Sequence, residues 1–290
     1  MSFSHNPGLW LKRHGARALL GASLLSLLFA APALADGYAL PGQVGMLPPV
    51  TPIAEEIHFF YNGILTPIIF AVSIFVGALL LYVVYRFNEK ANPTPSVLTH
   101  HTGLEVAWTI APVLILVFIA IPSFRLLDHE LVIPKTDMTV KVTGHQWYWS
   151  YSYPSDGFDF DSYIKADKDL KPGDLRQLAV DNAAVVPVNK TVLVQVTATD
   201  VIHSFTVPSF GVRVDAVPGR LNQTWFRATQ VGTYYGQCSK LCGEDHAYMP
   251  IVFRVVSDAD YAAWLTDAKK KFSANALPHY ADASPPTARN

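Results

Sequence analysis

GTYYGQCSKLCGEDHAYMPIVFRVV, residues 232–256, places two thiols, an imidazole and a thioether between two segments of alternating apolar residues. Such alternation is typical of β-strands, and a loop between two strands can turn four side chains toward one point. Thiolate and thioether ligands select copper over hard cations, and imidazole binds copper as well. A further histidine lies 35 residues before the first cysteine, near the end of a predicted strand. The stretch therefore predicts a copper site in a β-domain, with five candidate ligands: His203, Cys238, Cys242, His246 and Met249.

A site for one blue copper ion needs one Cys, two His and a weak axial Met. This loop has a second cysteine, which such a site would not use. Two bridging thiolates can hold two copper ions side by side, with His203 capping one ion and His246 the other. Met249 and a backbone carbonyl of the loop between the cysteines would fill the weak positions. We therefore expect a two-copper electron-transfer site.

Three other interpretations of the loop are open. A disulfide between Cys238 and Cys242 would suit an exported chain, but it closes a very short loop and leaves the histidines and Met249 unexplained. Zinc binds Cys and His, although a Met ligand is not expected for it. His246 and Met249 are each ordinary as a surface or core residue, and only their joint spacing favours ligands.

Short alternating segments continue upstream, and we expect one β-domain over residues 126–256. Turn residues separate the segments and no long amphipathic helix lies between them, which favours an antiparallel sandwich or barrel. A helix is expected over 257–272, and the proline-containing tail 273–290 is expected to be disordered. The predicted strands cover five ranges: 139–143, 191–197, 224–227, 232–235 and 251–256.

Two uncharged segments predict a transmembrane hairpin over residues 64–125. Residues 64–85 and 106–124 contain no charged side chain, and at about 1.5 Å per residue each is long enough to cross a bilayer as a helix. Half of the 290 residues are apolar and the mean hydropathy is positive, as lipid-facing segments require. Residues 36–63 are expected to be an outer segment before the hairpin.

The first 35 residues have the layout of a secretory signal peptide. A basic start precedes an apolar run, and the small-residue step Ala33-Leu34-Ala35 resembles a cleavage site. A short transmembrane helix is the alternative, but the apolar run is too brief to cross a bilayer. Export places the loop 86–105 inside and the β-domain outside.

Charge and motif content exclude two classes of function. The formal net charge is −1, or −4 without residues 1–35, and no basic stripe interleaved with aromatic residues is present, so we expect no nucleic-acid partner. The chain contains no Cys-x-x-Cys-His for haem attachment and no recognisable nucleophile or acid/base pair. We therefore expect an electron carrier without haem rather than a catalyst acting alone.

Four motifs resemble subunit II of the haem-copper cytochrome c oxidases, bacterial branch: GHQWYWSY at 144–151, DVIHSF at 200–205, PGRLNQ at 218–223 and GQCSKLCGEDHAYMPI at 236–251. The resemblance covers residues 52–256. It implies a Greek-key cupredoxin domain that carries the binuclear CuA centre. It also implies electron transfer from cytochrome c to haem in subunit I, where oxygen is reduced to water and protons are pumped, and a neighbouring subunit III. The location implied is a bacterial inner membrane, with the domain in the periplasm.

The resemblance also implies where electrons enter. The family's tryptophan at the position of Trp147 is the surface point of electron input, although an aromatic run such as 147–151 is also ordinary for a strand. Residues 128–200 carry eleven acidic and seven basic side chains, enough to attract a basic cytochrome c. Four aspartates are the docking candidates, two by family position and two expected nearby: Asp181 and Asp200, then Asp156 and Asp159.

Two more positions take their meaning from the resemblance. Glu105 matches a glutamate at the inner mouth of a proton path into subunit I, and in the pattern Thr102-Gly-Leu-Glu105 it also predicts a capping box. Lys240 stands where the family usually has a glutamate whose carbonyl binds copper and whose side chain reaches magnesium. The carbonyl remains, but an ammonium cannot ligate magnesium, so we expect no magnesium ligand from this chain.

Three other families share part of the pattern. Nitrous-oxide reductase has the same kind of copper loop but needs a large catalytic domain and no hairpin. A membrane-tethered copper-delivery protein of thioredoxin-like fold pairs Cys-x3-Cys with a distant histidine, but a β-α-β pattern would be expected around the cysteines. Quinol-oxidase subunit II has the architecture without the copper ligands.

Overall fold

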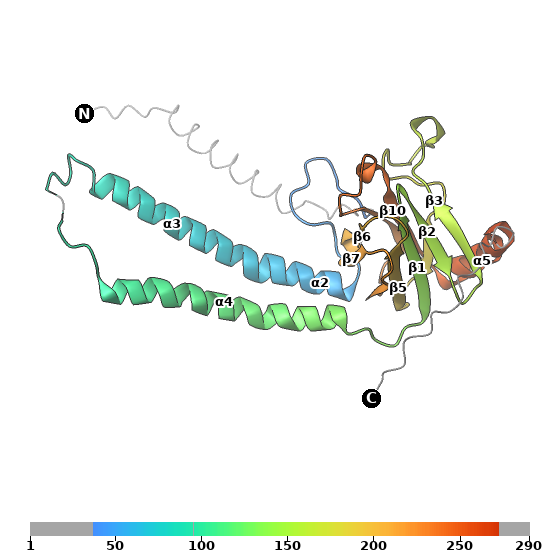
Figure 1. Cartoon of the computed structure of the whole chain (residues 1–290), viewed down its shortest axis with the longest axis horizontal. Coiled ribbons are helices and arrows are strands. Elements are labelled where there is room, and N and C mark those ends of the chain that lie inside the picture. Colours follow the sequence, from blue (N-terminus) through green and yellow to red (C-terminus); the bar gives the residue numbers. More distant parts are fainter. Residues whose placement is uncertain (1–36, 95, 273–290) are drawn as a thin grey trace, which may run out of the picture.

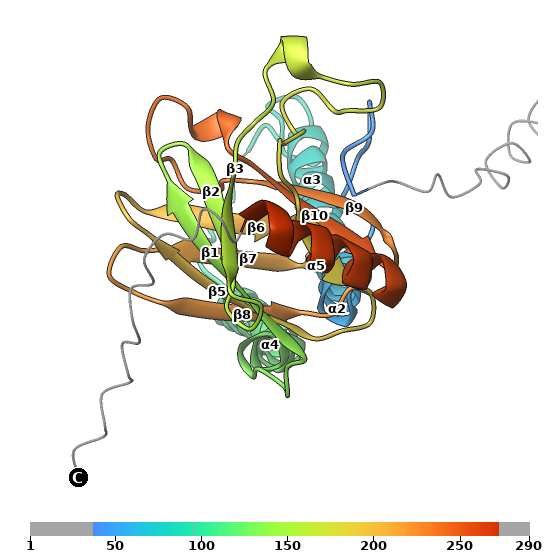
Figure 2. The same ribbon diagram turned by 90° about the vertical axis from the view of Figure 1, so that its right-hand side faces the viewer.

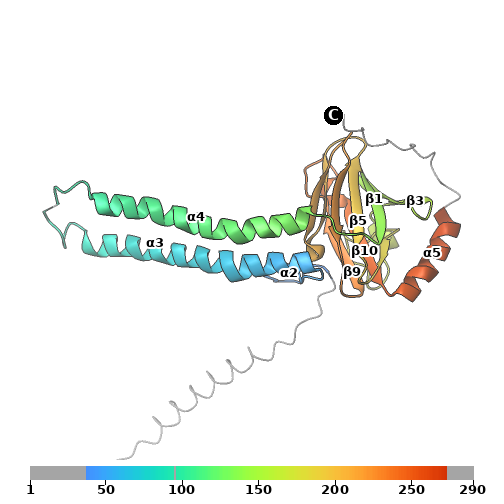
Figure 3. The same cartoon turned by 90° about the horizontal axis from the view of Figure 1, so that it is seen from below.

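Two long helices run side by side and lead into a β-domain at one end, as the computed structural model shows for residues 37–94 and 96–272 (Figures 1 and 3). The first is continuous through α2 (Pro52–Phe59), the π-helical turn η1 (Phe60–Leu65) and α3 (Thr66–Arg86), and the second is α4 (Thr102–Leu131). Both are long and apolar enough to cross a membrane, and their most apolar windows are not buried within the protein. The predicted signal peptide and tail lie outside the described residues.

Both helices extend beyond the uncharged segments 64–85 and 106–124. The added turns contain Glu55 and Glu56 in α2, and Arg125 and Asp128 in α4. Absence of charge marks only the part of a helix that lies in hydrocarbon, whereas backbone hydrogen bonding continues into the polar layer. The first helix therefore begins within the segment 36–63, which was expected to precede the hairpin.

The hairpin is fastened to the β-domain at its outer end. Thr51 caps α2 by accepting a hydrogen bond from the Ala54 N–H, while its hydroxyl donates to the Phe210 carbonyl at 2.8 Å. The Val50 N–H donates to the Ser209 carbonyl at 3.0 Å. Thr51 is fully buried, so these bonds are shielded from water and fix the direction in which the helices leave the domain.

The inner end of α4 corrects the predicted capping box. His101, not Thr102, is the N-cap, and its ring Nδ1 accepts a hydrogen bond from the Leu104 N–H at 3.2 Å. The Glu105 carboxylate accepts from the His101 N–H at 3.1 Å. An unprotonated imidazole nitrogen can accept the bond that a threonine oxygen usually accepts, so the cap lies one residue earlier than the pattern predicted.

The β-domain is a sandwich with a helix against one side (Figure 2). One sheet has the order β3-β2-β1-β5-β8, a second has β4-β10-β9, and the hairpin β6-β7 lies beside them. The strands are β1 (Met138–His145), β2 (Tyr148–Tyr153), β3 (Phe158–Ser162), β4 (Ala184–Pro187), β5 (Val192–Ala198), β6 (His203–Val207), β7 (Val212–Ala216), β8 (Asn222–Phe226), β9 (Gly232–Gln237) and β10 (Pro250–Val256).

The core forms from the alternate residues of facing strands. Val140 and Val142 of β1 and Trp149 and Tyr151 of β2 are fully buried, with intermediate exposure between them. From the opposite side Phe253 packs edge-on against Tyr151 at 5.8 Å between ring centroids. Burial of these large apolar and aromatic surfaces is the main stabilising contribution to the domain.

The expected fold class, a two-helix hairpin followed by an all-β sandwich, is confirmed. Two pairings, β1 with β5 and β4 with β10, are nevertheless parallel rather than antiparallel. The sequence patterns also missed β3, β4, β6 and β7. All four residues of β4 are buried, and β6 is nearly as enclosed, so neither shows the alternation that marks a half-buried strand.

Candidate metal centre

The five predicted side-chain ligands converge at one end of the sandwich. Cys238 follows β9, Cys242 lies in the loop to β10, and Met249 directly precedes β10. His246 begins the short 3-10 turn η4 (His246–Tyr248), and His203 begins β6, which packs beside β9. Since β9 and β10 are antiparallel neighbours, the loop that joins them stays at one edge and brings its side chains together.

The distances within this group suit metal ligation. The two sulfurs lie 3.9 Å apart, Cys238 Sγ is 4.0 Å from His203 Nδ1, and Cys242 Sγ is 3.5 Å from His246 Nδ1. Met249 Sδ lies 3.6 Å from Cys242 Sγ. Ligand atoms that share a metal ion at about 2.0–2.3 Å are separated by about 3.3–4.6 Å, so the donor set fits. Both thiols are free, and their separation is well beyond the S–S bond of about 2.05 Å.

The backbone of the loop adds an oxygen donor. The Lys240 carbonyl lies 3.3 Å from Cys238 Sγ, inside the same group, while the Lys240 side chain is exposed. His203 and Met249 are buried and both cysteines are 6% exposed, whereas His246 is half-buried. The group is therefore shielded from water except at the edge where His246 lies.

Asp200 orients His203. One carboxylate oxygen accepts from His203 Nε2 at 2.8 Å and from the Val201 N–H, and the other accepts from the Gln146 N–H at 2.7 Å. A carboxylate on the far nitrogen fixes the ring and leaves Nδ1 directed at the sulfurs, as metal-binding histidines require. Sequence reasoning assigned Asp200 only to docking, although its position three residues before a candidate ligand could have indicated this contact.

The two thiols differ in acidity. Burial opposes ionisation of Cys238, but His203 and the backbone of Lys240 and Ser204 outweigh it and lower the pKa to about 6. Burial and the neighbouring Cys238 raise the pKa of Cys242 to about 12. The first thiolate thus opposes formation of the second. A bound cation reverses this, because it stabilises both thiolates and releases their protons.

Two glycines allow the close contacts around the site. A Cβ on Gly144 would lie 2.9 Å from the His203 ring, and a Cβ on Gly243 would lie 2.8 Å from the Trp147 ring. Gly243 also has a φ of +128°, a backbone conformation that residues other than glycine rarely adopt. The space taken up by these rings is therefore available only because both positions lack a side chain.

Comparison with known proteins identifies the family. The transmembrane domain of cytochrome c oxidase subunit II matches residues 39–126, and the periplasmic domain of the same subunit matches residues 138–256. A probable cytochrome c oxidase subunit 2 of Rickettsia felis is 51% identical over 232 residues, which make up 80% of this chain and 73% of the Rickettsia protein. The chain belongs to the cytochrome c oxidase subunit II family.

Other members of the subunit II family are similarly related. The cytochrome c oxidase subunit 2 of Cereibacter sphaeroides is 50% identical over 251 residues, covering 80% of this chain and 82% of that one. The crystal structure of the periplasmic domain of subunit II from Bradyrhizobium japonicum is 58% identical and covers 49% of this chain and 99% of its own, with a TM-score of 0.46. Family membership makes the chain a membrane-anchored part of a haem-copper oxidase, which is an oxidoreductase complex.

The architecture around the cysteines bears on the copper-delivery alternative. In this subunit II chain the cysteines lie between two antiparallel strands of one sheet, joined by a loop with a single 3-10 turn. A thioredoxin-like fold was expected to surround them with a β-α-β unit. The predicted resemblance to subunit II is thereby confirmed by both the fold and the family matches.

Trp147 lies between the protein surface and the ligand loop. Its ring is half-buried, and its Nε1–H donates to the Cys242 carbonyl at 3.3 Å. The Gln146 side-chain amide donates to the same carbonyl at 2.8 Å. Trp149, the buried neighbour in the run, donates to the Met249 carbonyl at 3.1 Å. Sequence reasoning missed Gln146 and Trp149, because nothing in their spacing shows contact with residues about a hundred positions away.

A cavity of about 520 Å³ opens beside Trp147. Sequence reasoning missed it, since the loop between β3 and β4 folds back over the β1–β2 turn to form one side. Tyr148 and Tyr163 stack there at 4.4 Å between ring centroids. The other side chains around it are mostly polar or charged, among them Lys165, Arg176 and Asp245.

The four candidate docking aspartates do not gather on one surface. Asp200 is next to Trp147 through the Gln146 backbone, and Asp181 holds the Tyr163 N–H at 2.8 Å. Asp156, which pairs with Lys269 at 2.9 Å, and Asp159 lie toward the far end of the β2–β3 hairpin. At about 3.3 Å per residue Asp159, opposite Ser152, is about 16 Å along the strand from Trp147 and Asp156 is farther, so the structure does not bring these two to the ring.

Proposed function

We propose that this subunit holds two copper ions between Cys238 and Cys242, accepts electrons from a cytochrome c at the outer face of a bacterial inner membrane, and passes them to haem in subunit I. Oxygen is reduced to water there and protons are pumped. The observation that carries the proposal is the convergence of two free thiols, 3.9 Å apart, with two imidazole nitrogens and a thioether.

Each side chain has a distinct role in this arrangement. Cys238 and Cys242 would supply the two sulfurs, and His203 and His246 would each supply Nδ1. Met249 and the Lys240 carbonyl would complete the set as weak donors. Bound copper would supply a one-electron redox centre, and the hydrogen bonds from Asp200 to His203 and from Gln146 and Trp147 to the Cys242 carbonyl would limit the movement of these residues. The exposed Lys240 ammonium supplies no magnesium ligand.

Electron paramagnetic resonance of the copper-loaded full-length chain tests the two-copper proposal. Two coupled copper ions that share one unpaired electron give a seven-line hyperfine pattern, and we expect that pattern. A four-line pattern would show a single copper and contradict the proposal. Cys242→Ser is the matched variant, because it removes one bridging sulfur and should convert seven lines to four.

We propose that electrons enter at Trp147. The half-buried ring and its hydrogen bond to the Cys242 carbonyl support this role, since a single side chain reaches from the surface to the ligand loop. Asp200 and Asp181 are the docking acids that the geometry favours, and the acidic surplus of residues 128–200 would attract a basic cytochrome c.

We also propose that Glu105 begins a proton path into subunit I. It lies in the first turn of α4 at the membrane edge, where a carboxylate can collect protons. Its contact with the His101 N–H gives it a structural role as well. Glu105→Gln keeps an acceptor for that N–H and removes the ionisable group. We expect oxidase turnover to fall in this variant, and unchanged turnover would leave only the capping role.

A further inference from the structure

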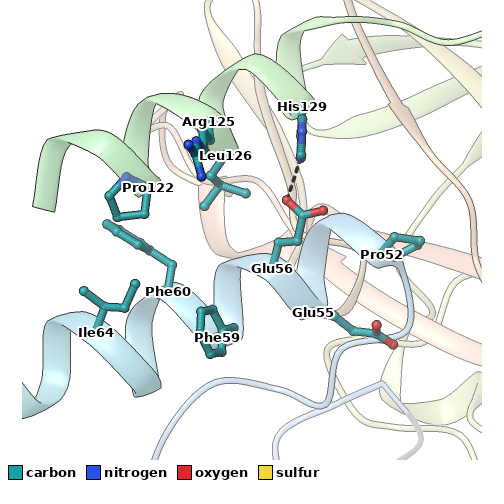
Figure 4. A pocket seen from close by; sticks show the side chains of 10 residues that line it. All are labelled: Pro52, Glu55, Glu56, Phe59, Phe60, Ile64, Pro122, Arg125, Leu126 and His129. Atoms are coloured by element: carbon teal, nitrogen blue, oxygen red, sulfur yellow. Dashed lines mark hydrogen bonds and ion pairs between the residues drawn. The ribbon is translucent and has the colours of Figure 1, made fainter.

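A cavity lies where the two helices leave the membrane for the β-domain. It has a volume of about 460 Å³ and lies between α2 with η1 on one side and the outer part of α4 on the other (Figure 4). Specific sites for small molecules commonly have this size. Ten residues line it: Pro52, Glu55, Glu56, Phe59, Phe60, Ile64, Pro122, Arg125, Leu126 and His129.

The lining changes from apolar to charged along the helix axes. Phe60 approaches Pro122 at one end, with Ile64 beyond it, whereas Glu56 and Arg125 lie toward the β-domain (Figure 4). Arg125 is the first charged residue after the uncharged run of α4, and Glu56 is the last before the uncharged run of the first helix. The charged end therefore lies at the depth of the lipid headgroups, and the apolar end at the depth of the acyl chains.

The charged end is incompletely paired within the chain. Glu56 Oε2 contacts His129 Nδ1 at 2.8 Å, which leaves Glu56 Oε1 free for another donor. For Arg125, no ion pair or hydrogen bond is found within residues 37–94 and 96–272. A cation and an anion thus face the same cavity from opposite helices. Such an arrangement complements a ligand that carries both charges.

We propose that this cavity binds one outer-leaflet phospholipid with a phosphate and a primary ammonium in its headgroup. The phosphate accepts hydrogen bonds from the Arg125 guanidinium, and the ammonium donates to Glu56 Oε1. One acyl chain lies against Phe60, Ile64 and Pro122. Glu55 and Glu56 would repel a headgroup with a net negative charge, and a quaternary ammonium has no N–H to donate, so the site selects the primary amine.

Native mass spectrometry of the intact oxidase complex tests the proposal. The complex is exchanged into nanodiscs that contain phosphatidylethanolamine, phosphatidylcholine and phosphatidylglycerol in equal amounts, then released and analysed for retained lipid. We expect one retained phosphatidylethanolamine in the native complex. Arg125→Gln and Glu56→Gln should each weaken retention by about tenfold or more, because each removes one charged partner of the headgroup.

Two further variants separate the site from general effects of charge. Arg86→Gln removes the same charge at the inner end of the hairpin, outside the cavity, and should retain the lipid. Leu126→Trp keeps every charge and fills the space between Arg125 and Glu56, so it should release the lipid. Equal retention in native, Arg125→Gln and Leu126→Trp complexes would overturn the proposal, as would equal retention of all three lipids.

A photoreactive amino acid at position 126 identifies what fills the cavity in the membrane. Crosslinking in the assembled complex should add the mass of a phospholipid to this subunit. Crosslinking to another oxidase subunit would show that protein occupies the cavity, and it would overturn the lipid assignment.

Discussion

Asp200 connects the β1–β2 turn to the candidate metal ligand His203. Its carboxylate holds the Gln146 N–H with one oxygen and His203 Nε2 with the other. The side chain is 30% exposed, so the same residue also presents negative charge next to Trp147. Its two possible roles, positioning His203 and docking a partner, can be separated because copper affinity does not depend on the partner.

We expect Asp200→Ala to lower copper affinity by about 10–100-fold, the usual effect of removing the acceptor behind a metal-binding histidine. Competition with a copper chelator measures this in the full-length chain. Asp200→Asn should recover part of the affinity, since its amide oxygen can still accept from His203. Asp267→Ala, an exposed acid on the C-terminal helix, is the control and should be neutral. If the Asp200→Ala variant bound copper with native affinity, Asp200 would not position His203, and docking of the partner would remain as its role.

We expect Trp147→Ala to slow electron input from cytochrome c by about 100-fold, the scale of loss when reacting groups are misplaced. Copper should stay bound, because Trp147 only donates to the Cys242 carbonyl and is not a ligand. Stopped-flow oxidation of cytochrome c by the assembled oxidase gives the rate, with copper content measured in parallel. Leu241→Ala, an exposed side chain of the same loop, should leave the rate unchanged. A normal rate in Trp147→Ala would refute the assignment.

The C-terminal helix α5 (Asp258–Phe272) lies against β3 and β4 and also packs on Tyr153 at the end of β2. Trp264, Ala268 and Phe272 are spaced by four residues and therefore share one face of the helix. Trp264 packs on Tyr153 at 5.3 Å between ring centroids, and Phe272 stacks on Phe160 at 4.7 Å. The Lys269–Asp156 pair fastens the polar side.

We expect Trp264→Ala to destabilise the β-domain by about 2 kcal/mol, less than for a fully buried tryptophan because the ring is only partly buried. Chemical unfolding of the full-length chain in detergent, followed by aromatic circular dichroism, measures the change. The copper spectrum should not change, since α5 packs on β3, β4 and Tyr153, which lies at the opposite end of β2 from Trp147. Thr266→Ala on the exposed face is the control. An altered copper spectrum would show that α5 also supports the metal centre.

At the scale of the whole molecule, the distribution of charge distinguishes the membrane hairpin from the β-domain. The surplus of acidic residues lies in 128–200, after the second uncharged span, while the hairpin is uncharged over both membrane spans. A net negative charge speeds the association of a positively charged partner by long-range attraction, without adding much to the affinity of the complex.

We expect electron input from a basic cytochrome c to slow by about tenfold as ionic strength rises from about 0.01 M to about 0.15 M. The screening length falls from about 30 Å to about 8 Å over that range, which removes long-range attraction. The second-order rate measured by stopped flow at several salt concentrations gives the dependence. A small uncharged reductant, used in place of cytochrome c, should show little change. A salt-independent rate for cytochrome c would contradict docking by charge.

Patterns in the sequence were sufficient to predict the fold class and the convergence of the candidate ligands. Cys238, Cys242, His246 and Met249 lie within twelve residues, so a single loop had to bring them close. Absence of charge over 64–85 and 106–124 was enough to predict two spans, because the bilayer imposes one composition on every residue that crosses it. Strands buried on both faces, such as β4, gave no alternation and were missed.

The sequence by itself thus determined which chemistry is available: soft ligands in one loop, a hairpin that spans a membrane, and an acidic domain outside it. Only the tertiary structure decided the contacts between residues far apart in the chain. It paired Asp200 with His203, set Gln146 and Trp147 on the Cys242 carbonyl, separated Asp156 from Trp147, and formed the cavity between Glu56 and Arg125. Such contacts depend on strand order and packing, which local sequence patterns do not predict.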